Sequence, residues 1–150
     1  MILNSFFSFL HFAAAFSVMG TLLFERITFS RNPTLREAKR LQKVDQFYGM
    51  SSILVILLGF LRVYYFEKGS SFYFSSTFFW VKMGMFVIVG LLSIYPTIKM
   101  IKWKEWLDKN EAPEMTDQEF LKIKKIMNFE LFFLSLVILS ASMMAKGIGF

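Results

Sequence analysis

The stretch Ile2–Phe24, ILNSFFSFLHFAAAFSVMGTLLF, decides the fold of this chain. It carries no formal charge, and as a helix it would be about 34 Å long. The hydrocarbon core of a membrane is about 30 Å thick, so the stretch predicts a transmembrane helix. It also contains the only histidine of the protein, His11. A titratable ring inside an apolar span is costly and usually has a partner or a function.

The composition as a whole is that of a membrane protein. Of the 150 residues, 55% are hydrophobic, 20 are Phe, and the mean hydropathy is +0.50. The net charge of +6 is explained by Lys and Arg in cytoplasmic loops that face anionic lipid, so we expect no nucleic-acid partner. The chain has no cysteine, which excludes disulfides, iron–sulfur clusters and thiolate sites.

A cleaved signal peptide is the alternative interpretation of the first apolar run. No Lys or Arg precedes the run, and it is longer than the apolar region of a typical signal peptide. We therefore expect an uncleaved transmembrane helix.

Four spans are predicted within a single integral membrane domain over residues 1–150, at about 2–24, 47–66, 77–100 and 126–145. The connecting segments 26–46 and 101–125 each contain a capping box, Thr34 to Glu37 and Thr116 to Glu119. Helices should therefore begin near Leu35 and Asp117, outside the membrane. The predicted fold class is all-α, an antiparallel four-helix transmembrane bundle.

The positions of Lys and Arg predict the orientation of this polytopic protein. Six lie between Arg26 and Lys43 and seven between Lys99 and Lys125. The connection after the second span has one, the C-terminal tail has one, and the N-terminus has none. The positive-inside rule then places both termini outside and both basic segments in the cytoplasm.

Three basic side chains, His11, Arg62 and Lys82, fall in the outer half of this bundle, near Met143 and Met144. Arg62 and Lys82 could equally extend to the outer interface with their aliphatic stems in lipid. His11 could be a neutral ring bonded to a carbonyl or to a serine. The methionines are more typical of core filling than of metal ligation.

A second polar layer is predicted toward the cytoplasm, and with His11 it forms what we call the polar seam. His11 and Glu25 lie about 40° apart around the helix axis and so share a face. Glu25 beside Arg26 and Glu130 beside Lys124–Lys125 can also be interpreted as plain interfacial charges, and that interpretation is favoured. The layer consists of Glu25, Asp45, Tyr48, Tyr95, Thr97 and Glu130.

Several short motifs resemble a bacterial family of four-span membrane proteins known only as a domain of unknown function. They are Leu10-His11-Phe12, Glu25-Arg26, Gly59 to Arg62, Phe79 to Met83, and Leu91 to Thr97. The resemblance covers nearly the whole chain. It implies a four-helix membrane fold in the bacterial inner (cytoplasmic) membrane.

The chain is also distantly similar to the membrane-bound protoporphyrinogen oxidases, through a His early in span 1 and a Lys near the start of span 3. Those proteins use such a His and Lys and bind haem b, so the resemblance implies roles for His11 and Lys82. The four-helix layout is similar to that of copper-resistance membrane proteins as well. Copper capture, however, needs more ligands than this chain offers.

Two functional hypotheses follow from the sequence. In the first, the protein binds haem b or a porphyrin for redox chemistry, with His11 as the iron ligand and Arg62 and Lys82 near the carboxylates of the cofactor. Met143, Met144, Lys82, an open position or a second protomer would complete the coordination. In the second, it is a non-catalytic accessory subunit or a small transporter of an anion or solute. Whether it is an enzyme stays open. The expected partners are the lipid bilayer and either a second copy or a membrane complex.

Overall fold

The computed structural model describes residues 2–66 and 69–148, and within them it contains helices and no β-strand. Four of the helices are long and apolar enough to cross a membrane, which confirms the predicted all-α four-span architecture. The helices are α1 (Ile2–Thr28), α2 (Leu35–Leu61), the π-helix η1 (Arg62–Phe66), α3 (Ser70–Phe74), α4 (Thr77–Lys102), α5 (Lys104–Leu107) and α6 (Asp117–Ala145).

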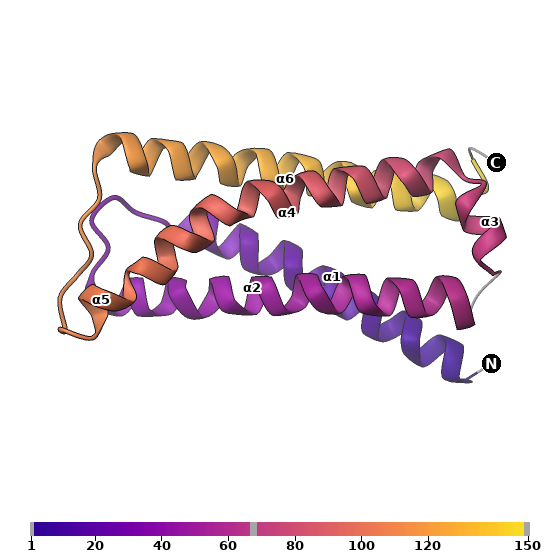
Figure 1. Ribbon diagram of the computed structural model, residues 1–150, viewed down its shortest axis with the longest axis horizontal. Helices are drawn as coiled ribbons and strands as arrows, with labels where there is room; N and C mark the ends of the chain where they lie inside the picture. Colours follow the sequence, from indigo (N-terminus) through magenta and orange to yellow (C-terminus); the bar gives the residue numbers. More distant parts are fainter. Residues whose placement is uncertain (1, 67–68, 149–150) are drawn as a thin grey trace.

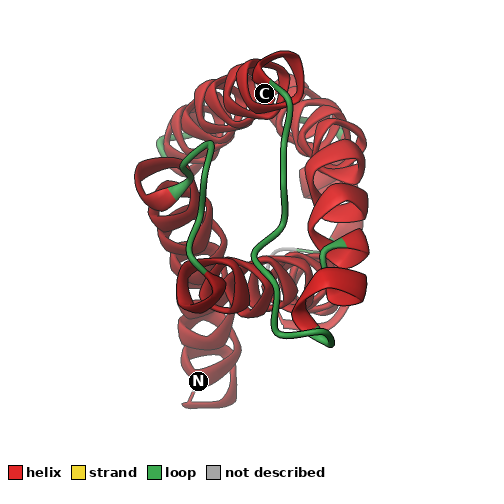
Figure 2. Ribbon diagram, turned by 90° about the vertical axis from the view of Figure 1, so that its left-hand side faces the viewer, coloured by secondary structure: helices red, strands yellow, loops and turns green. Residues whose placement is uncertain are grey.

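The long helices form two hairpins that lie side by side (Figure 1). α1 packs along α2 in the first hairpin, and α4 packs along α6 in the second. Both chain termini lie at one end of the bundle, which we call the terminal end. The connections within each hairpin lie at the other end, the loop end, from which Figure 2 shows the long helices arranged around a common axis.

Both predicted capping boxes are present and fix where the second helix of each hairpin begins. The Thr34 hydroxyl accepts from the Glu37 amide, and the Glu37 carboxylate accepts from the Thr34 amide at 2.8 Å. Thr116 and Glu119 repeat the arrangement at the start of α6. Each box satisfies backbone amides that have no partner within the helix. The helices therefore begin at Leu35 and Asp117, as predicted.

The second helices of the two hairpins also bury corresponding positions. A shift of 82 positions relates Tyr48 to Glu130, two residues that bond to each other, and it also relates the two capping threonines. The same shift of 82 positions relates four buried residues of α2 to four buried residues of α6. These are Leu41, Asp45, Tyr48 and Leu58, and Ile123, Met127, Glu130 and Ser140.

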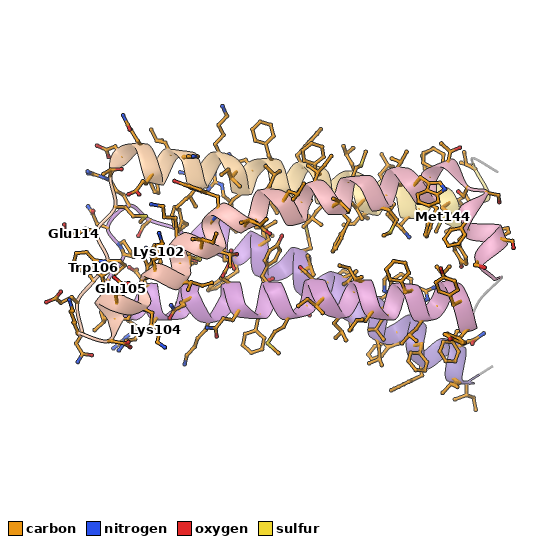
Figure 3. All side chains as sticks on the ribbon, viewed as in Figure 1. Lys102, Lys104, Glu105, Trp106, Glu114 and Met144 are labelled. Carbon is orange, nitrogen blue, oxygen red and sulfur yellow. The ribbon has the colours of Figure 1, made fainter. Side chains whose placement is uncertain are left out.

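The outer surface of the bundle is apolar along its length. Phe16 on α1 is 79% exposed, and Ile53, Leu91 and Phe132 on the other long helices are also more than half exposed. An exposed apolar surface of this extent fits contact with lipid hydrocarbon. Charged residues such as Lys102 and Lys104 lie at the loop end, where Figure 3 labels them together with Trp106.

Candidate functional site

Three carboxylic acids occupy core positions in three different helices. On α1 the buried residues Val18, Leu22 and Glu25 follow one another at helical spacing, and the buried Phe29 comes directly after the end of the helix. On α6 Ile123, Met127, Glu130 and Leu134 repeat the same spacing, and on α2 Asp45 lies between Leu41 and Tyr48. Residues spaced by three and four positions share one helix face. Glu25, Asp45 and Glu130 therefore point inward with the core.

These three residues, with Tyr48 and Thr97, make up what we call the carboxylate cluster. Glu25, Asp45 and Glu130 are only 2%, 4% and 1% exposed. The Tyr48 hydroxyl donates to Oε1 of Glu130 at 3.3 Å, and the Thr97 hydroxyl donates to Oδ1 of Asp45 at 2.8 Å. Oε1 of Glu25 is buried and has no hydrogen-bond partner among the described residues. The described residues therefore leave one carboxylate oxygen of the cluster without a hydrogen bond.

Among the described residues, no basic side chain forms an ion pair with the carboxylate cluster. In the part of the chain that the structure describes, neither Glu25, Asp45 nor Glu130 pairs with a Lys, Arg or His, and both of the other acids act electrostatically on Glu25. Burying an uncompensated carboxylate costs several kcal/mol, so such groups are neutralised by a proton or a bound cation. Over residues 2–66 and 69–148, no three His, Cys, Asp or Glu side chains are grouped so as to hold a metal ion.

Polar contacts at the loop end join the two hairpins. Nε of Arg26 on α1 donates to Oδ1 of Asn128 on α6 at 2.5 Å. Arg31 forms an ion pair with Asp117 at 2.6 Å, and both side chains are exposed. A further ion pair, between Lys99 and Glu119, lies within the second hairpin. The loop end therefore carries one exposed ion pair between the hairpins and one inside a hairpin.

A groove of about 340 Å³ runs between α2 and the α4–α5 segment near this end. Two of its lining residues, Gln42 and Gln46, lie on either side of Asp45 in the sequence of α2. Nε2 of Gln42 donates to the Met100 carbonyl at 3.0 Å and so connects α2 to α4. The lining consists of Lys39, Gln42, Gln46, Ile101, Lys104, Leu107 and Asp108.

The predicted cofactor residues lie toward the terminal end. The His11 ring on α1 packs against Gly59 of α2, where a Cβ would lie 3.3 Å from Cε1 and 3.7 Å from Nδ1. The Arg62 guanidinium lies 5.4 Å from the ring centroid of Phe12.

On the second hairpin, Nζ of Lys82 lies 5.3 Å from the Phe79 ring centroid. Met144 packs with Val63, Tyr73 and Phe79, and Figure 3 shows it near the C-terminal end of α6. His11 and Arg62 thus lie on the first hairpin, and Lys82 and Met144 lie on the second.

The polar seam is only partly the arrangement that the sequence predicted. Glu25, Tyr48 and Glu130 come together, whereas Tyr95 lies under Lys122, whose Nζ is 4.1 Å from the ring centroid. The interfacial interpretation favoured for Glu25 and Glu130 is wrong, because both are almost fully buried.

Sequence reasoning also did not recognise that Asp45 and Thr97 bond to each other in the same cluster. The signal was the regular spacing of buried residues, which assigns Asp45 to the core face of α2. The neighbouring basic residues obscured the same signal for the two glutamates.

Four apolar helices around a buried polar cluster define a four-span integral membrane protein. The chain belongs to the family described as "Predicted membrane protein (DUF2214)", whose model matches residues 3–149. No curated protein matches the sequence. No solved structure matches it either.

Proposed function

We propose that this protein is a membrane transport protein whose carboxylate cluster binds and releases a proton or a small monovalent cation. One observation carries the proposal: Oε1 of Glu25 is buried, has no hydrogen-bond partner among the described residues, and lies near two further buried acids. Acidic groups placed inside a membrane bundle mark ion pathways and proton relays. The cluster supports the transporter hypothesis, with a cation in place of the anion expected from the sequence.

A proton fits the cluster better than a multivalent metal ion. A divalent ion needs several oxygen ligands converging at about 2.0–2.6 Å, and the described residues contain no such group of acids. A proton needs only one carboxylate oxygen, and Glu25 offers one. The hydroxyls of Tyr48 and Thr97 already bond the other two acids and can support whichever of them is ionised.

The proposal places the protein in the bacterial inner membrane with its loop end in the cytoplasm. Its support is the excess of Lys and Arg in the segments 26–46 and 101–125 over the other connections. The carboxylate cluster would then lie closer to the cytoplasmic surface than to the outer one.

Labelling with dicyclohexylcarbodiimide, which reacts with protonated carboxyl groups in apolar surroundings, tests the proposal directly. We expect mass spectrometry of the protein in vesicles to find an adduct on Glu25 or Glu130, and less of it at higher pH or with a competing monovalent cation. Glu25→Gln should reduce the labelling, whereas Asp117→Asn, which removes an exposed carboxylate, should not. An unlabelled cluster at every pH would contradict the proposal.

Haem or porphyrin binding is the second candidate, and the packing of His11 favours it. The ring packs against Gly59 of α2, where the absence of a side chain leaves room for the imidazole. Arg62 and Lys82 would pair with the propionates of the cofactor. A bound haem would supply one-electron redox chemistry.

Adding haemin to the purified protein separates this candidate from the first. We expect a Soret band that His11→Ala removes, and a shift of that band in Met144→Ala if the sulfur is the second ligand. A preparation from which gel filtration removes all of the haemin would exclude haem binding. If carbodiimide labelling also failed, a non-catalytic accessory subunit would be the better description.

A further inference from the structure

The groove between α2 and the α4–α5 segment is a basic site separate from the carboxylate cluster. At the loop end α4 leans away from α6 toward α2, so that α5 lies beside the start of α2 (Figure 1). Lys39 of α2 and Lys104 of α5 therefore line the same groove. Its volume of about 340 Å³ falls within the range of small-ligand sites, about 300–1,000 Å³.

The charges that line the groove favour an anionic ligand. Lys39 and Lys104 contribute two positive charges and Asp108 contributes one negative charge, which leaves a net charge of +1. Neither lysine forms an ion pair within the described residues. Lysine ammonium groups bind phosphate oxygens as compact point charges, and the exposed Gln46 amide adds hydrogen-bond donors beside them. A phosphate ester with one negative charge is therefore the ligand that this lining fits best.

Apolar side chains continue from the groove toward the terminal end on both of its long helices. Ile53 follows the groove residue Gln46 by seven positions on α2, and Ile94 precedes the groove residue Ile101 by seven positions on α4. Residues seven positions apart lie only about 20° apart around a helix axis. Both Ile53 and Ile94 are more than half exposed. This surface suits a ligand that carries acyl chains as well as a phosphate.

Trp106 indicates that the groove lies at the level of the lipid headgroups. It belongs to α5, between Lys104 and Leu107, and its side chain is partly exposed. Tryptophan is enriched at the boundary between membrane and water. Basic pockets between transmembrane helices at this level bind acidic headgroups.

We propose that this groove binds one acidic phospholipid, with its phosphate between Lys39 and Lys104 and its acyl chains along the exposed surface of α2 and α4. Phosphatidylglycerol fits the site, because its single negative charge balances the net charge of +1. Its headgroup hydroxyls can donate to the Asp108 carboxylate. The bound lipid contacts both hairpins, since α2 belongs to the first and the α4–α5 segment to the second. This site does not depend on proton or cation binding by the carboxylate cluster.

Native mass spectrometry of the delipidated protein, released from detergent micelles, tests the selectivity of the site. The protein is mixed with equal amounts of phosphatidylglycerol, phosphatidylethanolamine or phosphatidylcholine. We expect one phosphatidylglycerol to be retained per chain, and several-fold less of the two lipids that have no net charge. Equal retention of either neutral lipid would overturn the proposal.

Two pairs of substitutions distinguish the groove from the basic surface in general. Lys39→Gln with Lys104→Gln should weaken phosphatidylglycerol binding by about 30-fold, the effect of two lysines near an acidic lipid. Lys122→Gln with Lys125→Gln removes the same charge from exposed positions of α6 outside the groove, and should leave the binding unchanged. Unchanged binding in the first pair, or equal weakening in both pairs, would overturn the assignment to the groove.

A conservative variant and a soluble phosphate ester complete the test. Lys39→Arg with Lys104→Arg keeps both charges and should retain the lipid, whereas its loss there would contradict a site based on charge. Glycerol 3-phosphate has the phosphate without the acyl chains, and an equal concentration of it should not displace phosphatidylglycerol. Displacement would show that the groove takes a soluble phosphate ester, and would overturn the lipid assignment.

Discussion

Burial of the Glu25 side chain does not stabilise the folded protein. Oε1 of Glu25 is buried and has no hydrogen-bond partner in the described part of the chain, so an isosteric neutral group should be accommodated at least as well. We predict that Glu25→Gln raises the melting temperature of the purified protein by about 2–4 °C, the shift expected from about 1 kcal/mol in a chain of this size. Thermal denaturation in detergent measures it. A clear fall would mean that the carboxylate is structural.

Gly59 has the closest contact with His11 of any α2 glycine. A side chain there would displace the His11 ring, because even a Cβ would lie 3.3 Å from Cε1. We predict that Gly59→Leu destabilises the protein by about 1–3 kcal/mol, the usual range for overpacking. Gly49→Leu is the matched control, since nothing lies within 4 Å of a Cβ at that exposed position of the same helix. Denaturant unfolding of both variants compares them.

At the scale of elements, the two capping boxes should contribute equally to the free energy of unfolding. Thr34→Ala and Thr116→Ala each remove a hydroxyl that accepts an amide of the first turn. We predict a loss of about 1 kcal/mol in each, and much less in Thr34→Ser. Chemical denaturation followed by helical circular dichroism measures the losses. A large effect at only one threonine would contradict the equivalence of the two hairpins.

The helices could be predicted from the sequence because their signals are local. An apolar run and a threonine three residues before a glutamate specify α1, α2 and α6 without knowledge of their neighbours. The short helices α3 and α5 and the π-helix η1 were not predicted, because their residues also fit loops and interfacial aromatic stretches.

The candidate site needed tertiary information. Whether Glu25 faces lipid headgroups or the core depends on which side of α1 meets α2 and α6. In the sequence, the adjacent Arg26 favoured the interfacial interpretation of Glu25. In the structure, Arg26 bonds to Asn128 instead. The sequence placed Glu25, Asp45 and Glu130 in one polar layer, and the structure adds that all three side chains are buried in the core.

At the scale of the whole molecule, both termini lie at the same end of the bundle, opposite the basic connections (Figure 1). We predict that Lys146→Cys reacts with a membrane-impermeant maleimide added to intact cells, and that Lys109→Cys reacts only after permeabilisation. The positive-inside rule is the reason for this direction. The reverse labelling pattern would invert the orientation and place the carboxylate cluster near the outer surface.

Association with a second copy or with a membrane complex stays a prediction. Gly20, Gly84 and Gly90 are exposed and have nothing within 4 Å of a Cβ, so their helices could approach another helix closely. Chemical cross-linking in the membrane, followed by native mass spectrometry, would measure the number of chains.

The bond between Tyr48 and Glu130 bears on why two hairpins are joined in one chain. In a symmetric dimer of separate hairpins, the residue on the axis would face its own copy, so two tyrosines or two glutamates would meet. Two glutamates would repel each other, and two tyrosines would provide no acid. A single chain can instead hold a donor on one hairpin and an acceptor on the other. Joining the two hairpins in one chain thus permits a hydrogen-bond donor and an acid at corresponding positions, which a symmetric dimer of one hairpin could not have.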